Sequence, residues 1–367
     1  MKKTVKICFL MFSLSMFPQS ETSKLVSKTA ETTKLLKYLH SLSTSNKILF
    51  GHHLTNVERQ SEKDWNKAWD PTYSDVYKVT GSMPAVFSYD FGRGISKARE
   101  HCKAVYSWGG IVTISWHANN PATGGTCKDI AANPMRDLAI EGTVANKKWK
   151  AQLDLVAHEL NGLMFKGTKV PVIFRPFHEH TGSWFWWGKG NCSSEEFVIG
   201  WKFTVDYLRS KGVDNLLMAY SPSKPAVDDA HKNYTKVSYP GDAYVDILGF
   251  DQYDSNYLNL VRDARYMVEM AENHGKVAAI TEFGNRKGLN NNAGTIANWF
   301  SENLDPVHAD FIASKVAYAV TWMNTDENQY WTPNSGDKQF EDFLRYMKKE
   351  YSLLLKDVPD IYGNTFK

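Results

Sequence analysis

Residues 170–187 read VPVIFRPFHEHTGSWFWW, a short apolar run followed at once by charged and aromatic residues. The run at 170–174 is rich in β-branched residues and almost continuously apolar, as is typical of a strand buried on both faces. Polar and aromatic residues occupy 175–187, where this strand would end. The segment therefore predicts a strand of a parallel sheet with functional side chains at its carboxyl end.

The same pattern recurs at seven other places along the chain. These runs are residues 47–51 (KILFG), 85–90 (AVFSYD), 111–117 (IVTISWH), 216–220 (LLMAY), 247–251 (ILGFD), 277–282 (VAAITE) and 316–322 (VAYAVTW). Between them lie stretches long enough for helices, and residues 149–163 and 196–210 have the apolar spacing of one. Eight strands alternating with helices predict an α/β fold, a (β/α)8 TIM barrel. A doubly wound sheet is the alternative, but it does not require reactive residues at nearly every one of eight strand ends.

The first 20 residues have the features of a secretory signal peptide. Lys2, Lys3 and Lys6 form a charged region, and residues 7–17 form an apolar run that is too short to span a bilayer. The cleavage site lacks a clear small-residue pattern, so its position is approximate. We therefore expect secretion, with the periplasm as the destination and the extracellular space as the alternative.

The positions of the four cysteines bear on membrane attachment and on disulfide formation. Cys8 lies at the start of the apolar run and not just after it, so the layout for lipid attachment is missing and we expect no membrane anchor. Cys102, Cys127 and Cys192 remain in the mature chain, and this odd number allows at most one disulfide, with three possible pairings. Three buried thiols are the alternative.

Residues 21–367 contain no repeat, low-complexity tract or Pro/Ser-rich linker, which favours one catalytic domain. The chain has 43 Lys and Arg residues against 40 Asp and Glu, and three of the basic residues belong to the signal, so the mature chain is neutral. A neutral chain argues against nucleic acid or an acidic membrane as a partner. The 12 Trp, 18 Tyr and 19 Phe residues instead supply apolar faces suited to sugar rings.

Polar and aromatic residues follow nearly every predicted strand. They are His52 and His53, Tyr89 and Asp90, Trp116 and His117, residues 175–187, residues 251–253, Glu282, and residues 322–324. In a (β/α)8 barrel these strand ends meet at one face, where the chemistry of such barrels takes place. Two long connections, 119–148 and 183–194, are expected to shape a cleft there.

Glu179 and Glu282 are the candidate catalytic pair. Glu179 follows the fourth strand and Glu282 ends the seventh, so both carboxylates are predicted to project into one aromatic cleft. Cleavage of a glycosidic bond needs two such groups, one to protonate the leaving oxygen and one to attack the sugar or activate water.

These motifs resemble glycoside hydrolase family 26, in the large clan of retaining (β/α)8 glycoside hydrolases. The resemblance rests on the strand positions of Glu179 and Glu282, on RPFHE with His178 before the glutamate, and on Trp184 five residues after it. It covers essentially the whole mature chain. It implies that Glu179 is the acid/base, Glu282 the nucleophile and His178 a contact of the sugar at the cleavage point.

The resemblance also implies roles for five further residues. Tyr253, in FDQYD, would hydrogen-bond the nucleophile, and Trp322, in TWMN, would form the floor beneath the reacting sugar. Trp184 would be the platform on the leaving-group side, and His117, in SWHANNP, would bind sugar. Arg175 would orient the acid/base loop.

The physical requirements of the reaction agree with these roles. The nucleophile must be ionised, so Glu282 needs donors, which Tyr253 and Arg175 could supply. The acid must stay protonated, which an apolar wall such as Trp184 beside Glu179 would favour by desolvation. No cofactor and no metal are required, and the HEHTG spacing does not match the metalloprotease helix motif.

Several aromatic and histidine residues are left outside the predicted site. Core packing is the alternative to sugar binding for Trp149, Trp186 and Trp187. His101 is interpreted as a solvated helix residue.

The resemblance thus implies a retaining, endo-type β-1,4-mannanase that acts on mannan, galactomannan or glucomannan, including manno-oligosaccharides, and we expect a monomer. Release of mannobiose from chain ends is a further hypothesis. The first alternative is a related enzyme that acts on β-1,3-xylan or mixed-linkage β-glucan. A non-catalytic glycan-binding barrel and a metal-dependent hydrolase are alternatives from other classes.

Overall fold

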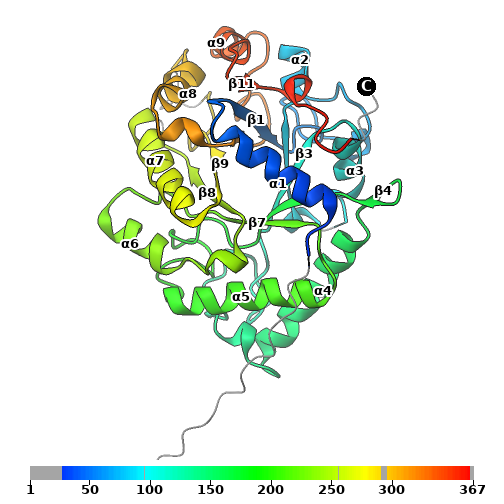
Figure 1. Cartoon of the computed structure of the whole chain (residues 1–367), viewed down its shortest axis with the longest axis vertical. Coiled ribbons are helices and arrows are strands. Elements are labelled where there is room, and N and C mark those ends of the chain that lie inside the picture. Colours follow the sequence, from blue (N-terminus) through cyan, green and yellow to red (C-terminus); the bar gives the residue numbers. More distant parts are fainter. Residues whose placement is uncertain (1–26, 95, 255, 291–295, 364–367) are drawn as a thin grey trace, which may run out of the picture.

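A computed structural model of the chain describes residues 27–94, 96–254, 256–290 and 296–363. Its centre is a closed barrel of eight parallel strands (Figure 1). They are β1 (Ile48–His53), β2 (Val86–Asp90), β3 (Ile111–Ser115), β6 (Val172–Arg175), β7 (Leu216–Tyr220), β8 (Ile247–Gln252), β9 (Val277–Phe283) and β10 (Tyr318–Thr321). Pairing of β10 with β1 closes the barrel, so the predicted (β/α)8 fold is confirmed and a doubly wound sheet is excluded.

Helices surround the barrel on its outside. They are α1 (Ala30–Leu42), α2 (Asp75–Thr80), α3 (Arg99–Ser107), α4 (Val144–Asn161), α5 (Ser194–Ser210), α6 (Asp229–Val237), α7 (Tyr257–His274), α8 (Trp299–Ala309) and α9 (Phe340–Met347). Short 3-10 helices are η1 (Trp65–Lys67), η2 (Phe91–Arg93), η3 (Asp137–Ala139), η4 (Asp242–Tyr244), η5 (Ala313–Lys315) and η6 (Leu355–Asp357). Three two-residue strands complete the structure, namely the hairpin of β4 (Met164–Phe165) with β5 (Thr168–Lys169), and β11 (Ser352–Leu353) beside β1.

Capping residues explain why two helices begin earlier than their apolar spacing predicts. The Thr143 side chain accepts a hydrogen bond from the Asn146 amide and starts α4. Ser193 and Glu196 form a capping box that starts α5. α4 therefore includes a first turn without a strong apolar pattern, which shortens the predicted connection 119–148, and α5 begins two residues before its predicted start.

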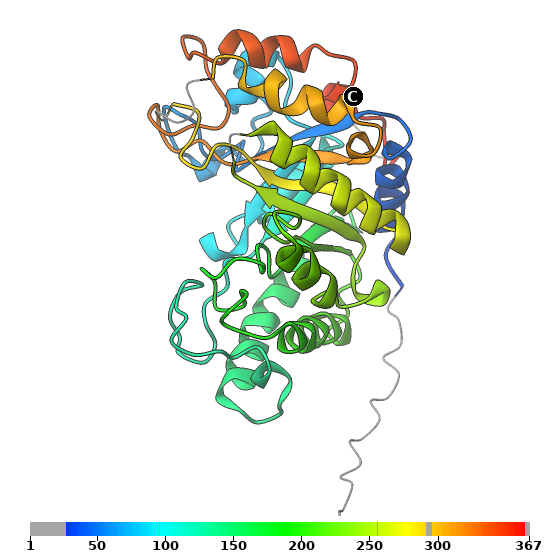
Figure 2. The same ribbon diagram turned by 90° about the vertical axis from the view of Figure 1, so that its left-hand side faces the viewer.

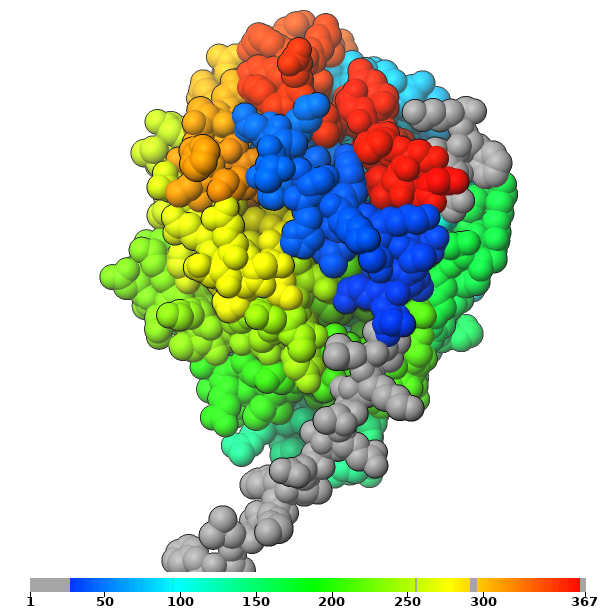
Figure 3. Space-filling view, in the orientation of Figure 1, coloured from blue at the N-terminus to red at the C-terminus, as the bar shows by residue number. Residues whose placement is uncertain are grey.

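The two ends of the barrel differ. α1 crosses the end at which the strands begin, beside the C-terminal segment, as the blue and red surfaces of Figure 3 show. Lys34 Nζ of α1 donates to the Tyr362 carbonyl at 3.0 Å and ties these segments together. The long loops lie on the opposite side, as Figure 2 shows. The strand ends that carry the polar residues are therefore the open ones.

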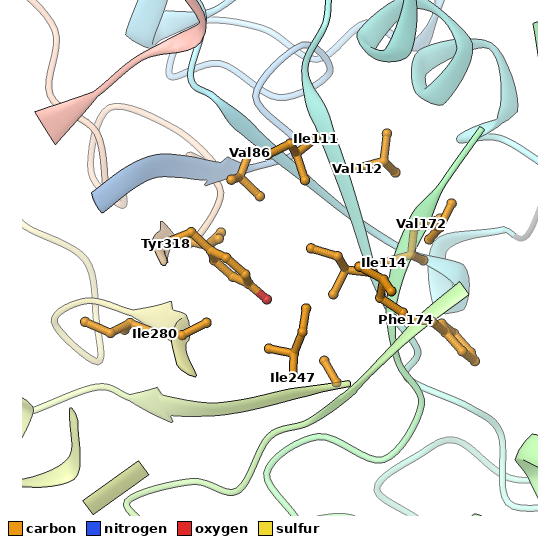
Figure 4. Close-up of a cluster of buried hydrophobic side chains, with 14 of the residues drawn as sticks. Val86, Ile111, Val112, Ile114, Val172, Phe174, Ile247, Ile280 and Tyr318 are labelled. Carbon is orange, nitrogen blue, oxygen red and sulfur yellow. The ribbon is translucent and has the colours of Figure 1, made fainter. Parts of the chain in front are cut away.

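Apolar side chains fill the barrel and the layer outside it. Ile114, Ile247 and Tyr318 point toward one another inside the barrel (Figure 4). In the outer layer, Trp149 of α4 is fully buried and stacks on Trp116 with ring centroids 4.7 Å apart. Trp149 is thus a core residue and not a sugar platform.

Two further predictions, on His101 and on the cysteines, have structural outcomes. His101 is only 1% exposed, so its interpretation as a solvated residue is wrong; the ring of Trp65 covers it at 5.4 Å. Cys102, Cys127 and Cys192 are free thiols, although Cys127 is only half-buried. Within the described residues, no helix is both long and apolar enough to cross a bilayer. The predicted signal peptide lies outside the described residues.

Candidate active site

A cleft of about 590 Å³ opens where the barrel strands end. It is lined by His117, Lys128, His178, Glu179, Thr181, Gly182, Trp184, Phe185, Ser223, Lys224, His231, Tyr253, Glu282, Arg286, Trp322, Gln329 and Trp331. A larger hollow of about 680 Å³ lies on the outer surface over α7, but no barrel strand contributes to its lining. The cleft at the strand ends is therefore the candidate active site.

The two predicted catalytic carboxylates face each other in this cleft. Oxygen atoms of Glu179, Glu282 and the neighbouring Asp251 lie within 4.8 Å of one another. Carboxyl groups about 5–5.5 Å apart are typical of retaining glycosidases, whereas inverting enzymes need about 6.5–9.5 Å to admit a water molecule. The spacing favours direct attack by one carboxylate.

An irregularity in β9 helps to aim Glu282. The pairing of β9 with β8 shifts register between Phe250 and Asp251, so that Asp251 pairs with Glu282. Such bulges re-aim side chains next to active sites. Glu282 is buried, and its carboxylate accepts hydrogen bonds from Arg175 Nη2 and, at 2.7 Å, from the Tyr253 hydroxyl. Burial raises the pKa of Tyr253 well above its usual value, which keeps this hydroxyl a donor.

Arg175 connects both carboxylate segments. Its Nη1 donates to Asp251 Oδ1 and to Ser221 Oγ, each at 2.8 Å. The Ser221 carbonyl in turn accepts the Glu179 amide at 2.7 Å. The guanidinium thus hydrogen-bonds Glu282 directly and is linked to the acid/base segment through Ser221.

Glu179 occupies an unusual backbone conformation and a different electrostatic environment. Its φ of 56° is left-handed, a strained state that is concentrated at functional sites. Burial and then the negative charge of Glu282 raise the pKa of Glu179 to about 7. The site therefore holds one carboxyl group whose pKa is raised to about 7 beside one that accepts hydrogen bonds from a guanidinium and a hydroxyl group, as acid/base and nucleophile require.

Trp184 has a different effect from the one predicted. Its side chain is 40% exposed, and its Nε1 donates to Glu179 Oε2 at 2.7 Å. This bond lowers the pKa of Glu179, an effect opposite to the one predicted for Trp184, although burial raises that pKa overall. The ring folds back over Gly182, where an added Cβ would lie 2.1 Å from Trp184 Cη2.

Aromatic rings and histidines form the wall and floor of the cleft. Trp322 stacks on buried His53, with centroids 4.2 Å apart and planes 9° apart. His117 stands edge-on to Trp322 at 6.4 Å and to His178 at 4.6 Å. Burial lowers the pKa of His178 well below its usual value, so this ring is neutral. Trp187 is buried behind it and donates to the His178 carbonyl at 2.8 Å.

The geometry agrees with a family comparison. The family model described as Glycosyl hydrolase family 26 matches residues 26–344. The chain belongs to glycosyl hydrolase family 26.

Mannanases from several bacteria are similar to this chain. A mannan endo-1,4-beta-mannosidase of Bifidobacterium adolescentis is 33% identical over 92% of this chain and 36% of its own length. The chain thus spans about a third of that relative. A structure of a Cellulomonas fimi endo-beta-1,4-mannanase double mutant has 35% identity and a TM-score of 0.84, covering 93% of this chain and 79% of the other. A GH26 beta-mannanase from Bacteroides ovatus has 33% identity and a TM-score of 0.80, covering 91% and 98%.

The histidines that flank Glu179 in this family 26 site do not converge. His180 points away from the cleft: its Nε2 contacts the Tyr220 hydroxyl at 2.8 Å, and its ring stacks on Phe197. The oxygens of Asp251 and Glu282 already accept hydrogen bonds from Arg175, whose positive charge would oppose a metal cation there. The same donors suit an ionised nucleophile.

The sequence did not single out several residues of the family 26 site. Asp90 and Asp251 each end a strand run, so the strand-end pattern contained them without distinguishing them from other polar residues. Lys224 lines the cleft with a left-handed φ of 48°, and it is paired with Asp254 at 2.7 Å. Trp331 reaches the cleft from a loop after β10 that has no recognisable motif.

Proposed function

We propose that this chain is a retaining endo-β-1,4-mannanase that hydrolyses mannan, galactomannan or glucomannan. The observation that carries the proposal is the close approach of Glu179 and Glu282, two carboxyl groups in contrasting environments. The mannanase names of relatives support the choice of mannan as the substrate. Trp322, His117 and His178 supply the ring contacts and polar groups that a sugar at the cleavage point needs.

In the first step, Glu179 donates its proton to the glycosidic oxygen while the Glu282 carboxylate attacks the anomeric carbon. The bond between that carbon and the leaving oxygen breaks, and an ester forms between the sugar and Glu282. Arg175 and Tyr253 hold the attacking carboxylate in place through its two oxygens. The shortened chain leaves over Trp184, whose indole also orients Glu179.

In the second step, Glu179 acts as a base. It removes a proton from water, the water oxygen attacks the anomeric carbon, and Glu282 leaves as a carboxylate. Glu179 is then protonated again, which restores the starting state. Two displacements at the same carbon retain the β configuration.

The test is the early product profile on mannan, glucomannan, xylan and mixed-linkage glucan. The wild type is compared with Glu179→Ala and Glu282→Ala. Cleavage of mannan that both substitutions abolish supports the proposal. Cleavage of another β-glycan would retain the mechanism and contradict the substrate. Glycan binding without turnover would instead support a non-catalytic barrel, and loss of activity with a chelator would support a metal-dependent hydrolase.

Release of mannobiose from chain ends is the second candidate mode of action. The loops after β3 and β6 bring Lys128, Thr181 and Trp184 to the cleft and could close one end of it. A ladder of product sizes at early times supports endo action, whereas mannobiose alone from the start supports end-wise release.

We also propose that the protein is exported to the periplasm and is monomeric. The charged and apolar residues at the start of the chain support export. Cell fractionation together with the N-terminal sequence of the mature protein tests the location and the cleavage site. Size-exclusion chromatography with light scattering tests the monomer.

A further inference from the structure

Asp90 is a buried carboxylate whose acceptor positions are all occupied. Its Oδ1 accepts the Gly92 amide at 2.6 Å and the His117 amide at 3.3 Å. Its Oδ2 contacts Ser115 Oγ and His117 Nδ1, both at 2.6 Å. Glycine at 92 permits this packing, because an added Cβ would lie 2.7 Å from Asp90 Oδ1. The carboxylate is therefore fixed in one orientation, at the end of β2.

This arrangement determines how the His117 ring is used. A carboxylate can only accept hydrogen bonds, so Nδ1 of His117 carries a hydrogen that it donates to Asp90. Nε2 is then the ring nitrogen left for the cleft that His117 lines. Of His117 and His178, which line the cleft, and His53 behind Trp322, only His117 has a carboxylate partner within hydrogen-bonding distance.

We propose that Asp90 is a positioning residue of the active site, which fixes His117 so that Nε2 faces a hydroxyl group of the sugar held over Trp322. This inference rests on the proposed glycosidase function. His117 touches the sugar, whereas Asp90 acts only through His117. When His117 is protonated, the negative charge of Asp90 balances it, so the pair does not oppose the positive charge that develops on the sugar ring.

The charges around the pair favour a protonated His117. Burial acts to lower its pKa, but Asp90 and, more weakly, Glu282 and Glu179 raise it above the usual value. The other titratable rings facing it are His178 and, beyond Trp322, His53. Burial also acts on Asp90, yet His117 and Ser115 lower the pKa of Asp90 overall. Both His178 and His53 have pKa values lowered well below the usual range by burial, so they add no charge.

The test compares Asp90→Asn, His117→Ala and the double variant on a defined manno-oligosaccharide. A charge-assisted hydrogen bond is lost in each single variant, so we expect kcat/KM to fall about 10- to 100-fold, mainly through KM. The double variant should lose no more than His117→Ala, because both changes remove one interaction. Asp342→Asn is the matched control, since Asp342 is a buried, hydrogen-bonded carboxylate of α9 outside the cleft; it should keep wild-type kcat/KM.

A spectroscopic readout separates positioning from mere packing. NMR of histidine-labelled protein should show His117 titrating above the ordinary value in the wild type and lower in Asp90→Asn. Wild-type His117 titrating below that value would overturn the inference, and so would additive losses in the double variant. If the wild type cleaved no glycan, the proposed function would fail, while the titration would still test the pairing of Asp90 with His117.

Discussion

The hydrogen bond between Trp184 and Glu179 predicts a shift in the pH dependence of catalysis. Trp184→Phe keeps an aromatic platform for the leaving group but removes the Nε1–H that now donates to Glu179 Oε2 at 2.7 Å. That bond stabilises the charged form of Glu179. Its removal should therefore raise the pKa of Glu179 further above its present value of about 7.

The size of the shift follows from the exposure of the indole. A hydrogen bond to a charged group contributes about 1.5–3 kcal/mol when it is shielded from water. Trp184 is 40% exposed, so water replaces part of the bond in the variant. Halving the contribution leaves about 0.7–1.5 kcal/mol, which corresponds to roughly 0.5–1 pH unit.

The assay is kcat/KM against pH on an unactivated manno-oligosaccharide, whose leaving group needs acid assistance. The free enzyme is competent only while Glu179 is protonated, so kcat/KM falls as pH rises through the pKa of Glu179. In Trp184→Phe, the fall of kcat/KM on the alkaline side, the alkaline limb of the profile, should move to higher pH by roughly 0.5–1 pH unit.

Trp69→Phe is the matched control for this prediction. Trp69 is another exposed tryptophan, 47% accessible, and its Nε1 donates to Glu100 at 3.3 Å away from the cleft. Its substitution should leave the limb unchanged. A limb that stays in place or moves to lower pH in Trp184→Phe would refute the reasoning, because the indole would then act as an apolar wall.

Three further predictions concern the nucleophile, the acid and the floor of the cleft. Tyr253→Phe should lower kcat/KM by about 10- to 100-fold by removing one donor to Glu282; near wild-type steady-state kinetics would contradict this. Glu179→Gln should raise thermal stability above pH 7 but not near pH 4.5. The pKa of Glu179 is 4.5 in the unfolded chain and about 7 in the folded protein, so ionisation of Glu179 destabilises the folded wild type as pH rises through this range. The gain should be on the order of 2 kcal/mol, measured by calorimetry across pH, and an equal gain at both pH values would count against it. Trp322→Ala should remove the stacking surface and weaken glycan binding, measured by calorimetry in Glu179→Ala; unchanged affinity would argue against a floor at Trp322.

The barrel could be predicted from the sequence because its strands are buried on both faces and therefore read as continuous apolar runs. A run such as VAAITE at 277–282 has no polar alternation, and the residues of β9 are all buried. Helix starts were less predictable, since capping at Thr143 and Ser193 depends on single side chains before the apolar pattern begins. His101 was misread because it directly follows the charged residues Arg99 and Glu100 in α3, whereas the ring of Trp65 in η1 covers it.

Site residues on strand ends could be placed from the sequence, but their interactions could not. Glu179 and Glu282 follow strands whose position in the barrel fixes where they emerge. Trp184 lowers the pKa of Glu179 because its ring folds back over Gly182 and its Nε1 donates to Glu179. No pattern in the sequence encodes this side-chain conformation. Likewise, the pairing of Asp90 with His117 joins two strand ends that are 27 residues apart in the chain.

The anomeric configuration of the first product tests the double-displacement mechanism most directly. The substrate is a manno-oligosaccharide whose own reducing end is chemically blocked. Proton NMR during its hydrolysis would record the newly formed reducing end before mutarotation. With carboxylate oxygens within 4.8 Å, the mechanism predicts that the β-anomer appears first and the α-anomer follows slowly. An α-anomer that appears first would show inversion through a water molecule, and Glu282 would then not be the nucleophile.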